Sequence, residues 1–255
     1  MTTKFDLHIH SCYSENLYGT RLFSPPSKSL PEDIIKTAIK KGIKVIAVTD
    51  HDNINGSLKT IEISKQKKYE DKIIVIPSVE VSSKEGHILA YNIYENIPRN
   101  LTAKETIKLI KEKGGFAVAA HPFNIKFSLS KECIKENINS LFGLEIANSH
   151  SLKNKYTENY VKQNNLKYTV GSDAHTLNEI GLCYGTIQKI NSKDEFLLAL
   201  KNGGIVSFHT HKKIISNILL NTVPGAINSF FYWKYQQICS LFFKNTFLPY
   251  KVKLK

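Results

Sequence analysis

The histidines near the N-terminus are the first residues of this sequence whose types and spacing suggest chemistry. The segment Asp6-Leu7-His8-Ile9-His10 places two imidazoles two positions apart in a strand-like run. Alternate residues of a strand project from the same face, so both rings are expected to point toward one place. Such a pair could bind a metal ion, although isolated pairs of this kind also occur in protein cores.

Further potential metal ligands recur along the chain, at or next to the ends of expected strands. They lie in Thr49-Asp50-His51-Asp52, at Glu80 and His87, in His121-Pro122 and in Asp173-Ala174-His175. The carboxyl ends of parallel strands share one edge of a sheet or barrel, so these side chains are expected to meet. Imidazoles and carboxylates without thiolates suit zinc, manganese or iron better than calcium.

A mixed site of this kind favours one reaction in particular. A carboxylate such as Glu80 could bridge two cations, and two or three cations would lower the pKa of a shared water and neutralise phosphate oxygens. The residues therefore predict a metal-dependent phosphoesterase in which a metal-bridging hydroxide attacks phosphorus.

The elements that would position these ligands alternate between short β-branched runs and lysine-rich helical patterns, which is typical of α/β folds with repeated βα units. Strands are expected at residues 5–10, 44–49, 73–81, 87–93, 116–120, 143–148, 168–173, 182–187 and 204–208. Helices are expected at residues 31–41, 56–69, 102–113, 130–140, 151–164 and 192–202.

Six ordered motifs, DLHIHS, VTDHD, PSVEVSS, HILAY, AAHPF and GSDAH, resemble those of the PHP (polymerase and histidinol phosphatase) superfamily over about residues 5–190. The resemblance implies a distorted (β/α)7 TIM-like barrel, the PHP fold, with a di- or trinuclear metal site. Carried over by position, the implied ligands are His8, His10, Glu80 and Asp173 for one ion, Glu80, His87 and His121 for a second, and Glu15, His51 and His175 for a third. Glu15 departs from the aspartate that small members commonly have there. His10, Glu80 and Asp173 are the expected catalytic residues.

Other side chains near these motifs are candidates for substrate binding or support. Arg21 could clamp a phosphate with its bidentate guanidinium, or it could be a solvated surface residue. Glu145 and Asn148, with His150 close by, could bind substrate or orient a ligand histidine. Asp50 or Asp52 is expected to orient the ring of His51, and Asp6 to brace the first strand.

The formal net charge of +13 is concentrated at the C-terminal end, because residues 196–255 carry eight lysines and no acidic residue. We expect one catalytic domain, residues 1–210, followed by a short aromatic and basic extension, residues 211–255. The extension could contact a membrane surface peripherally or pack against the barrel, and its excess of positive charge also suits nucleic acid. Scattered cysteines and an N-terminus without a secretory pattern favour the cytoplasm.

The substrate is left open between a small phosphomonoester and a short oligonucleotide. A rival hypothesis is a catalytically weak, metal-binding regulatory module that docks on a membrane through its C-terminal segment. The nine competent ligand positions favour an enzyme.

Overall fold

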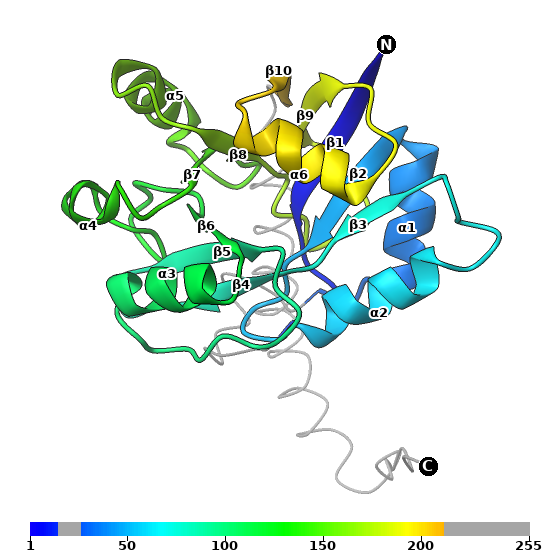
Figure 1. The fold of residues 1–255 in the computed structure, drawn as a ribbon, viewed down its shortest axis with the longest axis horizontal. Coiled ribbons are helices and arrows are strands. Elements are labelled where there is room, and N and C mark those ends of the chain that lie inside the picture. Colours follow the sequence, from blue (N-terminus) through cyan, green and yellow to red (C-terminus); the bar gives the residue numbers. More distant parts are fainter. Residues whose placement is uncertain (15–26, 212–255) are drawn as a thin grey trace, which may run out of the picture.

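The computed structural model describes residues 1–14 and 27–211, and these residues form two five-stranded sheets with helices packed on their outer sides (Figure 1). One sheet has the order β10-β9-β1-β2-β3 and the other β4-β5-β6-β7-β8. The strands are β1 (Thr2–Ile9), β2 (Ile43–Val48), β3 (Ile74–Ile76), β4 (Ser78–Ser82), β5 (His87–Tyr91), β6 (Phe116–Ala119), β7 (Gly143–Ala147), β8 (Tyr168–Val170), β9 (Cys183–Gln188) and β10 (Ile205–Thr210).

The helices match the expected positions, with shifts at several ends. They are α1 (Pro31–Lys40), α2 (Asn55–Ser64), α3 (Ala103–Glu112), α4 (Lys131–Asn137), α5 (Asn154–Gln163) and α6 (Lys193–Lys201). Sequence signals explain several starts: Pro31 opens α1, and Thr102 forms a capping box with Glu105 at α3. The expected helix at 56–69 ends five residues early, because Ile63 is its last buried apolar residue and turns follow.

The α/β architecture is confirmed, but the sheets are mixed rather than parallel throughout. Strand β5 runs antiparallel to both β4 and β6, and β9 runs antiparallel to β1 and β10. The first residue of β5, His87, therefore lies at the same edge as the last residues of the parallel strands. This reversal explains why a histidine that opens a strand can join ligands that close others.

The single strand expected at 73–81 is two strands, because Pro77 separates β3 from β4. Proline has no N–H to donate to a neighbouring strand. After it, the N–H of Ser78 donates to the Ser57 hydroxyl at 3.0 Å, and the chain leaves its parallel pairing with β2 to pair with β5. The break moves Glu80 into the second sheet.

Two isolated parallel bridges join the sheets beside the predicted ligands. Ile9 is bridged to Ala174, and His51 is bridged to Glu80. The N–H of His10 donates to the Ala174 carbonyl at 2.8 Å, and the N–H of Asp52 donates to the Glu80 carbonyl at 2.9 Å. Backbone hydrogen bonds thereby hold the end of β1 to the segment after β8, and the segment after β2 to the middle of β4.

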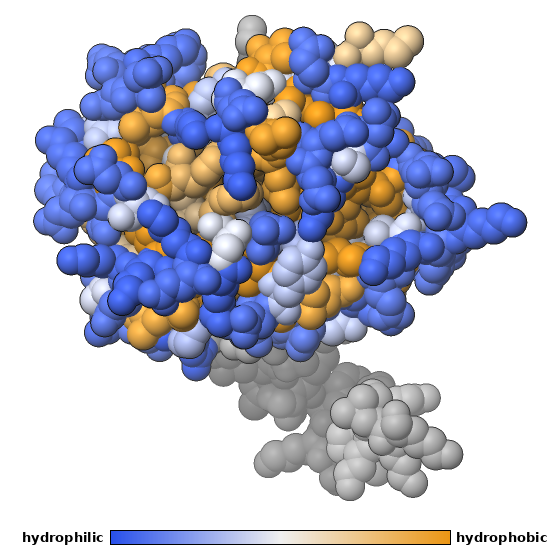
Figure 2. Space-filling model, viewed as in Figure 1, coloured by the Kyte–Doolittle hydropathy of each residue, from blue (hydrophilic) through white to orange (hydrophobic). Residues whose placement is uncertain are grey.

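Apolar side chains from both sheets pack into the core beneath this edge. The phenyl ring of Phe5 meets that of Phe196 edge-on, with centroids 5.3 Å apart, and the buried Tyr91 hydroxyl donates to the Leu7 carbonyl at 2.9 Å. Figure 2 shows the outside, where hydrophilic side chains cover most of the surface and hydrophobic ones show between them. Among the described residues, no helix combines the length and apolar composition needed to cross a membrane.

Candidate metal centre

The candidate site is built around the carboxylate of Glu80, which is fully buried in β4. Its Oε1 lies 3.1 Å from a ring nitrogen of His87 and 3.1 Å from one of His121. Its Oε2 lies 3.2 Å from nitrogens of His8 and His51 and 3.3 Å from His10 Nε2. Each oxygen therefore faces its own group of imidazoles.

Asp173 completes the group around the two histidines of β1. Its Oδ1 lies 3.1 Å from His10 Nε2 and 3.4 Å from His8 Nε2, and these two ring nitrogens are 3.2 Å apart. Four potential ligands of two types, the imidazoles of β1 and the carboxylates of Glu80 in β4 and Asp173 after β8, thus converge on one point. Such a donor set suits a borderline divalent cation.

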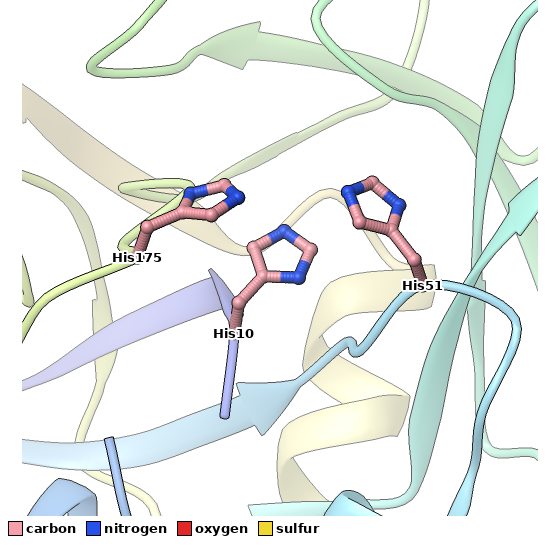
Figure 3. Close-up of side chains that lie close together, drawn as sticks. All are labelled: His10, His51 and His175. Atoms are coloured by element: carbon pink, nitrogen blue, oxygen red, sulfur yellow. The ribbon is translucent and has the colours of Figure 1, made fainter. Parts of the chain in front are cut away.

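A second group consists of His10, His51 and His175, whose rings lie close together in Figure 3. The His10 ring centroid is 4.6 Å from that of His51 and 4.3 Å from that of His175. The Nδ1 of His175 lies 2.9 Å from the Asp173 carbonyl oxygen, which fixes the orientation of the ring. His51, Glu80 and His87 form a further group of compatible geometry.

The hydrogen bonding of these histidines is incomplete in a way that fits cation ligands. Nδ1 of His87 and Nδ1 of His51 lie 3.1 and 3.2 Å from Glu80 oxygens without making a hydrogen bond, and the buried Nε2 of His87 has no hydrogen-bond partner among the described residues. Leaving buried polar nitrogens unsatisfied is costly, so a partner is expected there. Divalent cations would be that partner. Five of the predicted ligand histidines lie around Glu80, and Asp173 and His175 lie beside His10.

Backbone strain accompanies the site. His121, Asp173 and Asp52 have φ angles of 29°, 56° and 51°, a left-handed region that non-glycine residues seldom adopt. Such conformations persist where surrounding contacts hold them, and they cluster at functional sites. The turn at His121 follows β6 and brings its ring to Glu80, and the turn at Asp173 follows β8 and brings its carboxylate to His8 and His10.

The electrostatics divide the histidines into two classes. Burial alone would lower the pKa of His10, but its hydrogen bonds to Asp173 and Glu80 raise that pKa to about 9. Burial lowers the pKa of His175 to about 4, with a further contribution from neighbouring His10, and it also lowers the pKa of His51. The nearby imidazoles hold the pKa of Glu80 well below its usual range despite its burial.

These shifts predict that the metal-free chain loses stability above neutral pH. A histidine with a raised pKa in the folded state stabilises the fold below its ordinary value of 6.5 and stops doing so as pH rises through about 9. His10 alone would remove about 3 kcal/mol over that interval. Urea unfolding in chelator at pH 6.5 and pH 9 measures the difference.

The same experiment with divalent metal should reverse the trend, because protonated imidazoles must release protons before they can bind a cation. His10→Gln should flatten the decline seen in chelator. Equal stability of the metal-free wild type at both pH values would contradict the pairing of protonated His10 with Glu80 and Asp173.

Glu145 and Asn148 are buried beneath the candidate ligands, which favours orientation over substrate contact. Glu145 Oε1 lies 2.9 Å from His8 Nδ1, and Glu145 Oε2 accepts the backbone N–H of His121 at 2.7 Å. The Asn148 amide donates to Glu145 and to Asp173 Oδ2 at 2.9 and 3.2 Å. Of the two roles expected for Glu145 and Asn148, these contacts favour the orientation of ligand side chains.

The three aspartates beside the ligands support the backbone. Asp6 accepts hydrogen bonds from Ser172 and from the N–H of Gly181, so it ties β1 to the segment after β8, and burial raises its pKa to about 6. Asp50 accepts two bonds from Ser11. Asp52 accepts the N–H of Ser82 at 2.8 Å. Asp50 and Asp52 therefore hold neighbouring loops and do not orient the His51 ring as expected.

Three predictions fall outside the described residues. They concern Glu15 as a metal ligand, Arg21 as a phosphate clamp, and the C-terminal extension with its membrane contact.

Glu179 is a site residue that the sequence analysis missed. Its buried carboxylate accepts the backbone N–H groups of His175 and Thr176 at 2.8 and 3.0 Å, and Oε1 lies 3.8 Å from His150 Nε2. It thereby fixes the loop that carries Asp173 and His175. The sequence offered one indication of this role, an acidic residue four positions after His175. The segment has no strand or helix pattern, however, from which the burial of Glu179 could be predicted.

Comparisons with known proteins agree with this geometry. A family model described as PHP-associated matches residues 152–205. An uncharacterized protein of Methanocaldococcus jannaschii is 43% identical over 121 residues, which are 48% of this chain and 68% of that protein. A 5'-3' exoribonuclease of Haemophilus influenzae is 31% identical over 117 residues, 44% of this chain and 37% of the exoribonuclease.

A solved structure shares the fold. It is a two-domain protein from Bacteroides vulgatus containing a predicted PHP-like metal-dependent phosphoesterase, with a TM-score of 0.65 and 19% identity, covering 83% of this chain and 65% of that one. The six sequence motifs, the buried carboxylate that their histidines surround, and these relatives lead to one conclusion: the chain belongs to the PHP superfamily.

Proposed function

We propose that this chain is a metal-dependent phosphoesterase with a di- or trinuclear site. The observation that carries the proposal is the position of Glu80, whose two oxygens each face a separate group of imidazoles. A buried carboxylate in that position is suited to bridge two cations. Membership of the PHP superfamily supports the same reading.

The residues divide naturally among the proposed ions. His8, His10, Asp173 and Glu80 would hold one, Glu80, His87 and His121 a second, and His51 and His175, with Glu15, a third. Zinc, manganese or iron bound there would activate a water and offset the charge of phosphate oxygens. Glu145 and Asn148 would keep His8 and Asp173 in position for this task.

We propose further that the fold is the distorted (β/α)7 barrel, with residues 1–210 as the catalytic domain and 211–255 as an extension. The two bridges, Ile9 to Ala174 and His51 to Glu80, would be the points at which the two sheets close into one ring of strands.

For the substrate, we propose an oligonucleotide end in preference to a small phosphomonoester. The Haemophilus influenzae relative is named a 5'-3' exoribonuclease, and this chain has a formal charge of +13, which favours a phosphate backbone. Cleavage of a short RNA should therefore weaken markedly between 50 and 200 mM salt, whereas hydrolysis of a small phosphomonoester should change little.

Metal removal is the first test of the reaction. Chelation followed by dialysis should lower phosphoester hydrolysis at least about 100-fold, because the cations supply several kcal/mol of transition-state stabilisation. Manganese, zinc or ferrous iron, added separately, should restore it. The measurement is turnover on a panel of phosphomonoesters and 5'-phosphorylated RNAs, with elemental analysis of the same samples. Full activity in metal-free protein would rule out the proposed mechanism.

A further inference from the structure

Phe127 lies against the candidate metal centre in the loop between β6 and α4. Its ring stacks on the imidazole of His87, with centroids 5.3 Å apart and planes 15° from parallel. Its carbonyl oxygen accepts the backbone N–H of His87 at 2.9 Å. Two independent contacts thus fix Phe127 beside a residue that lies 3.1 Å from Glu80.

Phe127 differs from an ordinary core phenylalanine in its backbone conformation and in its exposure to solvent. Phe127 has a φ of 59°, in the left-handed region, and 42% of its surface is exposed. The next residue, Ser128, holds the loop to the site, because its hydroxyl donates to the His121 carbonyl at 2.8 Å and lies 3.0 Å from His121 Nδ1. The backbone therefore accepts strain while a large apolar ring stays in contact with water.

We infer that Phe127 is a stacking surface for the nucleobase next to the reacting phosphate; this inference rests on the proposed phosphoesterase function and specifies its substrate. A base is joined to its own phosphate through one sugar, and the phenyl ring of Phe127 is separated from Glu80 by one imidazole. A base lying on Phe127 would place its phosphate over the cluster. The exposed Lys126 beside it suits the charge of the backbone.

Stacking on an aromatic ring is tolerant of sequence, because every base presents a π face. The site would therefore select for the presence of a base rather than for its identity. Small phosphomonoesters without a planar group would bind only through the metal cluster.

The test compares a 5'-phosphorylated tetranucleotide RNA with the same molecule abasic at its first position. Phe127→Ala should lower kcat/KM for the first substrate on the order of 10-fold, mostly through KM, and change the abasic one by less than about twofold. Phe127→Trp should retain activity on both. Tyr94→Ala is the matched control, because Tyr94 is 55% exposed and follows the opposite end of β5.

A binding measurement on the full chain separates this inference from the proposed reaction. A 5'-terminal 2-aminopurine in the RNA should lose fluorescence on binding to wild type in chelator, and Phe127→Ala should abolish that quenching. Equal losses on base-containing and abasic substrates, or quenching that survives in Phe127→Ala, would overturn the stacking role and leave Phe127 as a support for His87. Absence of any phosphoester hydrolysis, with quenching intact, would reject the reaction and retain the stacking surface.

Discussion

Replacing Glu80 by glutamine is expected to lower kcat/KM for phosphoester hydrolysis at least about 1000-fold, since losing several kcal/mol of metal-derived stabilisation costs that much. Glutamine has nearly the same volume, so it removes a negative charge without leaving a cavity. One of its two terminal atoms becomes an amide nitrogen, which cannot bind a cation. The bridge between the two imidazole groups would therefore be lost.

The reason for so large an effect is the number of side chains that depend on this one carboxylate. Five imidazoles lie within 3.3 Å of its oxygens, and no other carboxylate among the described residues occupies a comparable position. Without its charge, the raised pKa of His10 should fall, because Glu80 is one of the two partners that raise it. Asp173 cannot replace the lost charge, because it lies beside His8, His10 and His175 and not beside His87 and His121.

The measurement combines activity, elemental analysis and circular dichroism on the same preparation. Glu80→Gln should retain its secondary structure and lose metal, whereas Glu112→Gln, a change on the exposed face of α3, should match wild type in all three. A Glu80→Gln protein with a full complement of metal and activity within tenfold of wild type would show that Glu80 is not the bridging ligand.

The sequence was sufficient to predict which residues gather, because their signals are local. His8 and His10 alternate along a strand, and His51, His121 and Asp173 follow strands whose apolar runs are short and bounded. The α/β class and the PHP superfamily follow from those same segments. The positions of histidines and acidic residues at the ends of expected strands are therefore enough to predict most of the residues that come together in the site.

What the sequence did not predict depends on partners distant in the chain. At Pro77 the chain changes its pairing partner from β2 to β5, and this change depends on β5 lying beside β4. The role of Glu179 depends on a loop folding back over its carboxylate. Asp50 or Asp52 was expected to orient the neighbouring His51 ring, but Asp50 accepts its hydrogen bonds from Ser11, 39 residues earlier in the chain. Such contacts have no periodicity to reveal them.

Gly171 shows the same limitation and leads to a second large expected effect. Gly171→Ala should reduce the free energy of unfolding by about 3 kcal/mol, the upper part of the range for overpacking a core. An added Cβ would lie 2.3 Å from His8 Cβ, 2.7 Å from the His8 backbone nitrogen and 3.0 Å from Glu145 Oε1. Two of these atoms belong to the rigid part of β1, so relief requires the strand itself to move.

That movement would also reach the chemistry, because the strand that must yield carries His8 and His10. A displacement of about 1 Å in a catalytic group can cost on the order of 100-fold in rate, so the folded fraction of Gly171→Ala should lose activity as well as stability. Gly114→Ala separates the two causes: its Cβ would meet nothing within 4 Å, and its φ of 77° imposes only a conformational cost of about 1 kcal/mol. If Gly171→Ala and Gly114→Ala had the same free energy of unfolding and the same turnover, the close approach of position 171 to His8 would not constrain β1. A loss confined to Gly171→Ala would instead mean that the close approach of these strands sets the position of the metal ligands.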